Sequence, residues 1–499
     1  MNEVIMGVDM GTQSLKVVIY DASQKCELAS ASQALDLIVR DDGSREQLAQ
    51  WWVEAFHICL QDLPAEPKTA VCAIAVSGQQ HGFVPVSEQG EVLAPVKLWC
   101  DTATVAECEA ITAAAGGEQA CLDLGGNNIA AGFTASKILY LKNNKPDAYE
   151  QMTSVMLPHD YLNFYLTGRR AMEYGDASGT GLLNVRERCW SAELVQALDP
   201  NRDLQSCFPE LLEADQVLGC LRSEFAEHFG FRDDVLVATG GGDNMMAAIG
   251  TGNLRPGCLT ASMGTSGTLF AYSDEPVIDQ AGQLAAFCSS TGGWLPLLCT
   301  MNCTVATEQM RDLFSVDLDG MQGLAAEVSP GSDGVLTLPF YNGERTPNLP
   351  HGKAVIYGLD MENTTQGHLI RSAMEAAVFG LKTGLLAFQN QGMEFTEVTL
   401  TGGGSKNPLW CQICADVLNL PVKVLQLEEN AAFGAVLQAL WCYRRKHGQD
   451  CDLSELAADY LQVDDSNSCT PAAETVQTYR EVYDSYTALL NTVSPLYQQ

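Results

Sequence analysis

The sequence predicts an α/β protein of two domains, each built around a strand–turn–strand unit. Its 499 residues exceed what a single hydrophobic core usually organises. Short apolar runs of strand length alternate with longer segments of helical pattern. The tripeptide Met-Gly-Thr occurs at 10–12 and again at 263–265, both times between strand-like runs, which favours a duplicated domain. We expect the division after residue 244, giving domains 1–244 and 245–499.

The elements of the first half follow from local pattern. Apolar runs predict strands at 4–8, 15–20, 27–33, 69–76 and 234–238, and a hairpin from 83–86 and 92–98. Helical spacing predicts helices at 46–59, 103–115, 135–142, 161–165 and 245–249. The segment from Glu173 to Gly181 is expected to be a polar, glycine-containing loop.

The second half repeats the opening unit and then alternates strands with helices. We expect strands at 258–262, 268–272, 334–338 and 397–400, and helices at 367–389, 431–445 and 474–490. Asn407-Pro408 opens a further helix, because proline is tolerated in a first turn. That helix carries a Cys-x-x-Cys, Cys411 and Cys414, which two core side chains explain better than a metal or redox site.

The composition limits the partners that this chain can have. Its 28 basic and 62 acidic residues give a net charge of −34, which repels nucleic acid and anionic membranes. The same charge repels ATP at long range, so a nucleotide site must rely on backbone N–H groups, a few basic side chains and a metal ion. The 18 scattered cysteines fit a reducing cytoplasm. The N-terminus shows no signal-peptide pattern, and we find no apolar run of membrane-spanning length.

A glycine run near the middle of the chain carries the clearest chemical signal. Gly240-Gly241-Gly242-Asp243-Asn244 follows a predicted strand and precedes a predicted helix. Glycines there allow a tight turn and the close approach of another molecule, and this position in α/β proteins commonly binds ligands. Asp243 can therefore accept a proton from a substrate hydroxyl. The alternative is that Asp243 or Asn244 only caps the helix.

Three turns of small residues have the composition of phosphate-binding turns: 9–14, 264–266 and 402–405. Each follows or joins strands, and two share the strand–turn–strand setting. The chain contains no P-loop, no complete G-x-G-x-x-G, no G-x-S-x-G elbow and no H-E-x-x-H helix. The common nucleotide folds and hydrolase signatures therefore do not apply.

Taken together, these motifs resemble the FGGY family of carbohydrate kinases. Residues 8–12 with Lys16 resemble its first phosphate motif, 262–266 the second, and 401–405 with Asn407 the adenosine motif. Residues 354–359, 368–369 and 372–375 are similar to its C-terminal signature. The resemblance implies two ribonuclease-H-like domains, as in the actin, sugar kinase and heat-shock chaperone ATPase superfamily, around a catalytic cleft. It assigns sugar binding and the first phosphate motif to the N-terminal domain, and nucleotide binding to the C-terminal domain.

The resemblance also implies a role for particular residues. Asp243 is the general base, and Asp9 organises Mg²⁺ through water. The other implied contacts are phosphate binding by Thr12, Gly264 and Thr265, adenosine binding by Gly403, Gly404 and Asn407, and sugar binding by Gln80, His81, Trp99, Asp101 and Asn244.

Several of these residues have a structural alternative. His81 can be a structural histidine, and Trp99 can simply pack. Asp101 can cap the helix expected near Ala103, and Asn407 can cap the helix at Pro408. Ala103 also departs from the family pattern, because many members have arginine there.

Within the family, the 78–82 and 343–347 segments look most like the xylulokinase branch. The implied reaction is ATP-dependent phosphorylation of D-xylulose to D-xylulose 5-phosphate. The alternatives are another acceptor (ribulose, gluconate, glycerol or a deoxy-ketose), a non-kinase ATPase switch, or a sugar-binding regulator. ATP and Mg²⁺ are the expected cofactors, and a homodimer is the expected assembly.

Overall fold

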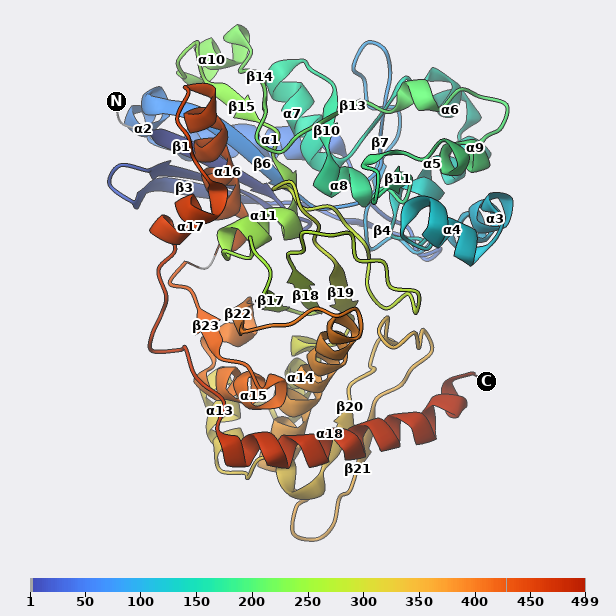
Figure 1. Cartoon of the computed structure of the whole chain (residues 1–499), viewed down its shortest axis with the longest axis vertical. Coiled ribbons are helices and arrows are strands. Elements are labelled where there is room, and N and C mark those ends of the chain that lie inside the picture. Colours follow the sequence, from blue (N-terminus) through green and yellow to red (C-terminus); the bar gives the residue numbers. More distant parts are fainter. Residues whose placement is uncertain (1–2, 428, 499) are drawn as a thin grey trace. The chain divides into compact units, whose positions relative to one another are not determined.

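The computed structural model describes residues 3–427 and 429–498, which pack as two compact units (Figure 1). The first unit runs to Leu254 and also contains Tyr272–Pro296 and Glu429–Leu461. The second unit comprises the rest of the described chain. Functional domains of 1–244 and 245–499 remain a prediction, because the compact units are interleaved along the sequence. Among the described residues, no helix combines the length and apolarity needed to cross a bilayer.

The first unit is organised around one mixed sheet. Its order is β14–β15–β6–β1–β2–β3, with β16 also paired to β6. The strands of the unit are β1 Val4–Met10, β2 Ser14–Asp21, β3 Cys26–Ala34, β4 Ile38–Val39, β5 Arg45–Gln47, β6 Val71–Gly78, β7 Val84–Val86, β8 Val96–Lys97, β9 Ser154–Met156, β10 Ala171–Glu173, β11 Leu183–Asn184, β12 Cys189–Trp190, β13 Glu210–Leu212, β14 Val217–Cys220, β15 Leu236–Ala238 and β16 Gly241–Gly242.

Helices of the first unit cover both faces of this sheet and form a second core beside it. They are α1 Ala49–Asp62, α2 Ala65–Ala70, α3 Val105–Ala115, α4 Glu118–Gly125, α5 Thr134–Asn144, α6 Pro146–Gln151, α7 Pro158–Thr167, α8 Tyr174–Ser178, α9 Ala192–Leu198, η1 Gln205–Cys207, α10 Ser223–Phe229, α11 Asp243–Gly250, α16 Asn430–Lys446 and α17 Leu453–Tyr460.

Alternation along β1 explains how α1 and α16 pack on opposite faces. Met6 and Val8 join the apolar core that contains Trp52 of α1. Gly7 points the other way, where an added Cβ would lie 2.3 Å from the carbonyl oxygen of Ala432 in α16. Successive strand residues face opposite sides, so the missing side chain at Gly7 lets α16 lie close to the sheet (Figure 1).

The second unit repeats the topology of the first. Its sheet has the order β19–β18–β17–β22–β23, with β17 antiparallel to β18 and parallel to β22. In the first unit β1 is likewise antiparallel to β2 and parallel to β6. The two Met-Gly-Thr tripeptides therefore occupy equivalent turns, as expected for a duplicated ribonuclease-H-like domain.

The elements of the second unit include a long helix, α14, beside this sheet (Figure 1). They are β17 Cys258–Met263, β18 Gly267–Ala271, β19 Leu297–Thr300, α12 Thr304–Phe314, α13 Leu318–Ala326, η2 Ser332–Gly334, β20 Leu336–Leu338, β21 Val355–Tyr357, α14 Gln366–Asn390, β22 Glu397–Thr401, η3 Gly403–Lys406, α15 Pro408–Leu418, β23 Val422–Val424, α18 Ala473–Val493 and η4 Ser494–Gln498.

Two local expectations were wrong, and a third was confirmed only in part. Glu46 begins no helix, because β5 pairs with β8, and α1 starts at Ala49. The two segments of the predicted hairpin are joined by isolated antiparallel bridges, Phe83–Lys97 and Val86–Val92, and β7 also pairs with β9, which was not expected. Part of the expected polar loop is the short helix α8, which the Glu173 side chain caps.

Candidate active site

The carboxyl ends of β1, β6 and β16 bring the two predicted catalytic acids to one edge of the first sheet. Asp9 pairs with Ser77 of β6, and Ser77 pairs in turn with Gly241 of β16. Asp243 follows β16 immediately as the first residue of α11. Because parallel strands end at the same edge, residues far apart in the sequence become neighbours there.

The glycine run is required by this close packing. Gly240 has a φ of +70°, and a Cβ there would lie 2.2 Å from the carbonyl oxygen of Val76. A Cβ on Gly242 would lie 2.7 Å from Cγ of Gln80. Only glycines therefore let this segment lie against β6 and deliver Asp243 to the edge of the sheet.

Asp243 is placed to exchange a proton near neutral pH. Burial raises its pKa to about 7, the negative charges of Asp9 and Asp176 add to that rise, and hydrogen bonds from Asn244 oppose it. Its Oδ1 accepts from the backbone N–H of Asn244 at 2.7 Å and from Nδ2 of Asn244 at 2.9 Å. The side chain does not cap α11, whose N-cap residue is Gly242.

Asp9 is the second carboxyl group at this edge. Its Oδ1 accepts a hydrogen bond from Oγ of Ser77 at 2.8 Å. Burial raises the pKa of Asp9 to about 6; the Ser77 bond opposes this, Glu429 adds to it, and Lys16 opposes it. Lys16 itself pairs with Glu429 at 2.9 Å.

The donor set at this edge fits a hydrated Mg²⁺. Within residues 3–427 and 429–498, neither Asp9 nor Asp243 has an ion-pair partner, so an added cation would relieve their mutual repulsion. The described residues contain no cluster of three or more metal-ligating side chains. Mg²⁺ commonly uses one or two carboxylates, with water and substrate phosphates completing its shell.

Two predicted sugar-binding amides lie next to Asp243. Nδ2 of Asn244 donates to Oε1 of Gln80 at 2.9 Å, and Nε2 of Gln80 approaches Sδ of Met245 at 3.2 Å. The contact between Gln80 and Asn244 orients both side chains, because each amide has one oxygen and one NH₂ group. The structure thus brings Gln80, Asn244 and Asp243 together.

Thr12 and Trp99 meet in a network that the sequence did not predict. Nε1 of Trp99 donates to Oγ1 of Thr12 at 2.9 Å, and that hydroxyl donates to Oε1 of Gln79 at 3.0 Å. Gln79 in turn donates to Oε1 of Gln47 at 2.8 Å. The single hydroxyl proton of Thr12 is donated to Gln79. To bind a phosphate oxygen, Thr12 would therefore have to use another donor group or release Gln79.

His81 is held in a conformation unusual for a side-chain-bearing residue, with a φ of +65°. Its Nδ1 lies 2.8 Å from the carbonyl oxygen of Gly179. A carbonyl oxygen only accepts, so Nδ1 of His81 carries a proton and donates to it. The rings of Phe133 and Phe287 flank it at 4.9 and 5.6 Å between centroids.

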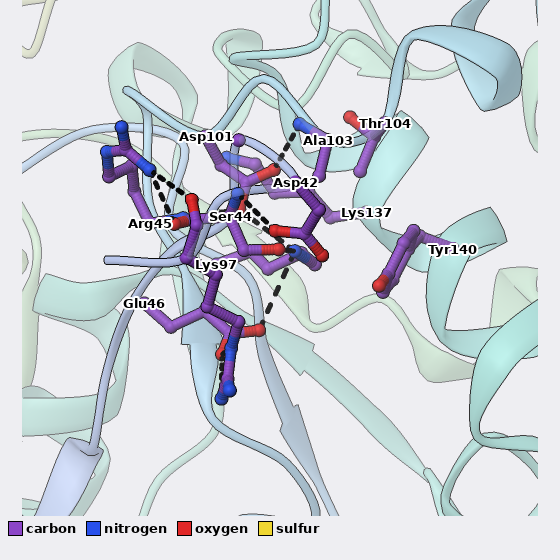
Figure 2. Close-up of polar contacts among 12 residues, drawn as sticks. Asp42, Ser44, Arg45, Glu46, Lys97, Asp101, Ala103, Thr104, Lys137 and Tyr140 are labelled. Carbon is purple, nitrogen blue, oxygen red and sulfur yellow. Dashed lines mark hydrogen bonds and ion pairs between the residues drawn. The ribbon is translucent and has the colours of Figure 1, made fainter. Parts of the chain in front are cut away.

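Asp101 is fully buried, and its carboxylate is bound by the protein itself (Figure 2). Oδ2 accepts from the backbone N–H of Arg45 and from Nζ of Lys97, both at 2.9 Å. Oδ1 accepts from the N–H of Ala103 at 3.0 Å, ahead of α3. These contacts favour a role in holding the loop, and sugar binding by Asp101 stays a prediction.

A buried acidic cluster behind Asp243 was missed by sequence reasoning. Nδ1 of His159 lies 2.6 Å from Oδ2 of Asp176, and Nε2 lies 3.0 Å from Oδ1 of Asp160. Burial alone would lower the pKa of His159, but Asp160, Asp176 and Glu173 raise it to about 9. A signal was present in the acidic residues of 173–176, which pattern alone placed in a loop.

The predicted nucleotide motifs of the second unit also lie side by side. Ser262 of β17 pairs with Thr401 of β22, so both strands end at one edge. Gly402 has a φ of +81°, and a Cβ there would lie 2.8 Å from the carbonyl oxygen of Met263. A Cβ on Gly404 would lie equally close to Cβ of Met263. Gly403 is exposed, with nothing within 4 Å of its Cβ position, which leaves its backbone open to a ligand.

The other predicted nucleotide residues have defined structural partners. The carbonyl oxygens of Gly264 and Thr265 accept from the start of α12, at 2.9 and 3.0 Å. Oδ1 of Asn407 accepts from the N–H of Trp410 at 3.2 Å, so the capping role predicted for it is confirmed. Cys411 and Cys414 are both buried in α15, as expected for core residues.

Comparison with known proteins identifies the family. The model of the FGGY family of carbohydrate kinases, N-terminal domain, matches residues 4–250, and the model of the C-terminal domain matches 259–443. The xylulose kinase of Haemophilus influenzae is 40% identical over 99% of this chain and 100% of its own length. The chain belongs to the FGGY family of carbohydrate kinases.

Other relatives agree with this assignment. The xylulose kinase of Streptomyces coelicolor is 35% identical over 87% of each chain. A crystal structure described as a xyloylose kinase from Brucella ovis has a TM-score of 0.91 and 29% identity, and covers 99% of this chain and 100% of that one. This carbohydrate kinase therefore has the two-domain α/β fold of the family throughout, and it is a phosphotransferase that uses ATP.

Proposed function

We propose that this carbohydrate kinase converts D-xylulose and ATP to D-xylulose 5-phosphate and ADP, with Asp243 as the general base. The observation that carries the proposal is Asp243 itself. Its carboxyl group lies at the end of a glycine run and next to Asp9, and burial raises the pKa of Asp243 to about 7. The choice of sugar is supported by relatives named xylulose kinase, 40% and 35% identical to this chain.

The chemistry follows from the position of that carboxyl group. As the acceptor hydroxyl attacks the γ-phosphorus, its proton passes to Asp243, and the bond to the leaving oxygen of ADP breaks. A base with a pKa near 7 is about half ionised at neutral pH and is still basic enough to take the proton. Asp9, with the ATP phosphates, would hold a hydrated Mg²⁺, which neutralises charge on the transferring group.

The remaining predicted residues divide between sugar and nucleotide. Gln80 and Asn244 contact each other beside Asp243, which supports a shared role in binding sugar hydroxyls. We infer the same role for His81, Trp99 and Asp101. The proposed nucleotide contacts are Thr12, Gly264 and Thr265 for the phosphates, and Gly403, Gly404 and Asn407 for adenosine.

The decisive measurement is ADP release with Mg-ATP, without acceptor and with D-xylulose, ribulose, gluconate or glycerol. We expect strong stimulation by D-xylulose, loss of activity in EDTA, and recovery on adding Mg²⁺. Asp243→Ala should lower kcat by about a hundredfold or more, since general-base catalysis contributes about 10²–10⁴-fold. Stimulation by another acceptor alone would reassign the sugar, and near-normal turnover of Asp243→Ala would refute the base.

We also propose a homodimer in a reducing cytoplasm, with sugar binding assigned to domain 1–244 and nucleotide binding to 245–499. All 18 cysteines are free thiols in the structure, which supports a reducing compartment. Light scattering on the purified protein tests the dimer, and a monomeric mass would refute it.

A further inference from the structure

Lys137, on α5, is a buried lysine that the proposed mechanism does not use. Its side chain is completely enclosed, and among the described residues it forms no ion pair. Instead its Nζ donates to two backbone carbonyl oxygens, those of His81 and Gly132, each at 2.7 Å. Burying an amine away from water costs free energy, so packing alone does not explain a lysine at this position.

The first carbonyl belongs to His81, whose backbone conformation has to be held in place by its surroundings. His81 has a left-handed backbone conformation, which persists in a non-glycine residue only when its surroundings hold it. The same carbonyl oxygen also accepts from Oγ1 of Thr134 at 3.2 Å, and Phe133 packs on the imidazole ring. The start of α5 thus fixes both the backbone and the ring of His81.

The second carbonyl connects Lys137 to the Trp99 segment. Gly132 lies so close to that segment that a Cβ on it would be 2.7 Å from the carbonyl oxygen of Trp99. One turn further along α5, the Tyr140 ring lies 4.3 Å from Nζ of Lys97, the lysine that binds Asp101 (Figure 2). One face of α5 therefore contacts two segments that carry predicted sugar-binding residues.

The chemistry of an amine suits this bridging position. Burial lowers the pKa of Lys137 to about 7, against the opposing charge of Asp101. The neutral amine has two N–H groups and the ammonium ion has three, so both forms can donate to both carbonyls. The bridge between His81 and Gly132 therefore survives loss of the proton.

We propose that Lys137 is a positioning residue for the sugar site, which sets acceptor affinity and discrimination between ketoses by fixing His81 relative to the Trp99 segment. The proposal rests on the proposed function, because it takes His81 and Trp99 to be sugar-binding groups. Loss of the bridge would leave ATP binding unchanged and would weaken only the binding of the sugar.

The test compares Lys137→Met with Lys68→Met in steady-state assays with D-xylulose and its 3-epimer D-ribulose. Lys68 is a matched control, since it is also buried and donates to one carbonyl oxygen, that of Leu60, at 2.6 Å. In Lys137→Met we expect the KM for sugar to rise about tenfold or more, the KM for ATP to stay within about twofold, and the preference between the epimers to shrink. Lys68→Met should change none of these.

A gentler pair of variants keeps the proposal testable if Lys137→Met does not fold. Thr134→Val removes the second donor to the His81 carbonyl and should raise the KM for sugar about two- to fivefold, and Thr134→Ser should restore it. The proposal is overturned if the sugar KM and epimer preference are unchanged, or if the KM values for sugar and ATP rise together. Failure of the proposed function is distinct: the wild-type protein would then show no stimulation by any sugar.

Discussion

Replacing Asp243 by asparagine should make the protein more stable near pH 8 while abolishing phosphoryl transfer. Asparagine is isosteric, and its Oδ1 can still accept both hydrogen bonds from Asn244. It removes only the negative charge, which burial and the neighbouring charge of Asp9 make unfavourable in the folded state. The charge of the proposed catalytic base is thus expected to destabilise the folded protein.

The magnitude follows from the shift in pKa. Folding raises the pKa of Asp243 from 3.8 to about 7. The stability that the neutral carboxyl group gives the folded state is fully present when the pH is below the pKa of the unfolded chain. It is lost as the pH rises through about 7. A shift of about three units corresponds to about 4 kcal/mol at about 1.4 kcal/mol per unit. Because the residue keeps some solvent contact, we expect about half of this, ~2 kcal/mol, at pH 8 and less than ~1 kcal/mol at pH 4.

Urea unfolding at pH 4 and pH 8, in EDTA and without nucleotide, measures the effect. Asp234→Asn is the matched control, because Asp234 pairs with Arg232 at 2.6 Å and that contact lowers its pKa. Removing its charge should give no stabilisation at pH 8. The reasoning is refuted if Asp243→Asn is no more stable than wild type at pH 8, or if it gains equally at both pH values.

Three further substitutions test the site. Gly240→Ala places a Cβ 2.2 Å from the Val76 carbonyl oxygen, and should lower the free energy of unfolding by more than about 3 kcal/mol. Ser77→Ala removes the donor to Asp9; the pKa of Asp9 then rises further, so the Mg²⁺ concentration giving half-maximal activity should increase, more at pH 6.5 than at pH 8. Asn407→Ala removes the cap of α15 and should cost about 1 kcal/mol in thermal unfolding, with a higher KM for ATP if the residue also binds adenosine.

Each of these has a control or a contrary outcome. Gly230 has a φ of +76° but nothing within 4 Å of its Cβ position, so Gly230→Ala should cost only the strain of about 1 kcal/mol. An equal Mg²⁺ requirement in Ser77→Ala and wild type at both pH values would contradict the role given to that hydroxyl. Asn407→Asp should keep the cap, since a carboxylate accepts the same bond.

Elements that depend on local pattern were predictable, and those that depend on distant pairing were not. The strands at β1, β2, β17 and β22 follow from apolar runs next to turn residues. Glu46 lies in a segment with good helix formers, yet pairing of β5 with β8 overrides that preference. The second partner of β7 is β9, where Pro85 pairs with Val155, 155 − 85 = 70 residues further along, and short-range pattern has no means of choosing it.

The same distinction holds for the site. Asp243 could be predicted as a site residue because its glycines, acid and amide stand together in the sequence. Gln79 and His159 were missed because their partners come from other segments: Thr12 and Gln47 for Gln79, and Asp176 for His159. An isolated glutamine or histidine in the sequence does not reveal a hydrogen-bond network whose other members come from distant segments.

Buried acids in the first unit give a physical reason for the proposed dependence on Mg²⁺. Burial raises the pKa of Asp9 to about 6, and those of Asp160, Glu173 and Asp243 to about 7. The imidazolium of His159 offsets part of this charge by facing Asp160 and Asp176. Asp9 and Asp243 have no such counter-ion among the described residues, and the chain as a whole carries a charge of −34. Free ATP would add to that repulsion, whereas ATP bound to a divalent cation supplies the missing positive charge, so the proposed substrate is the metal complex.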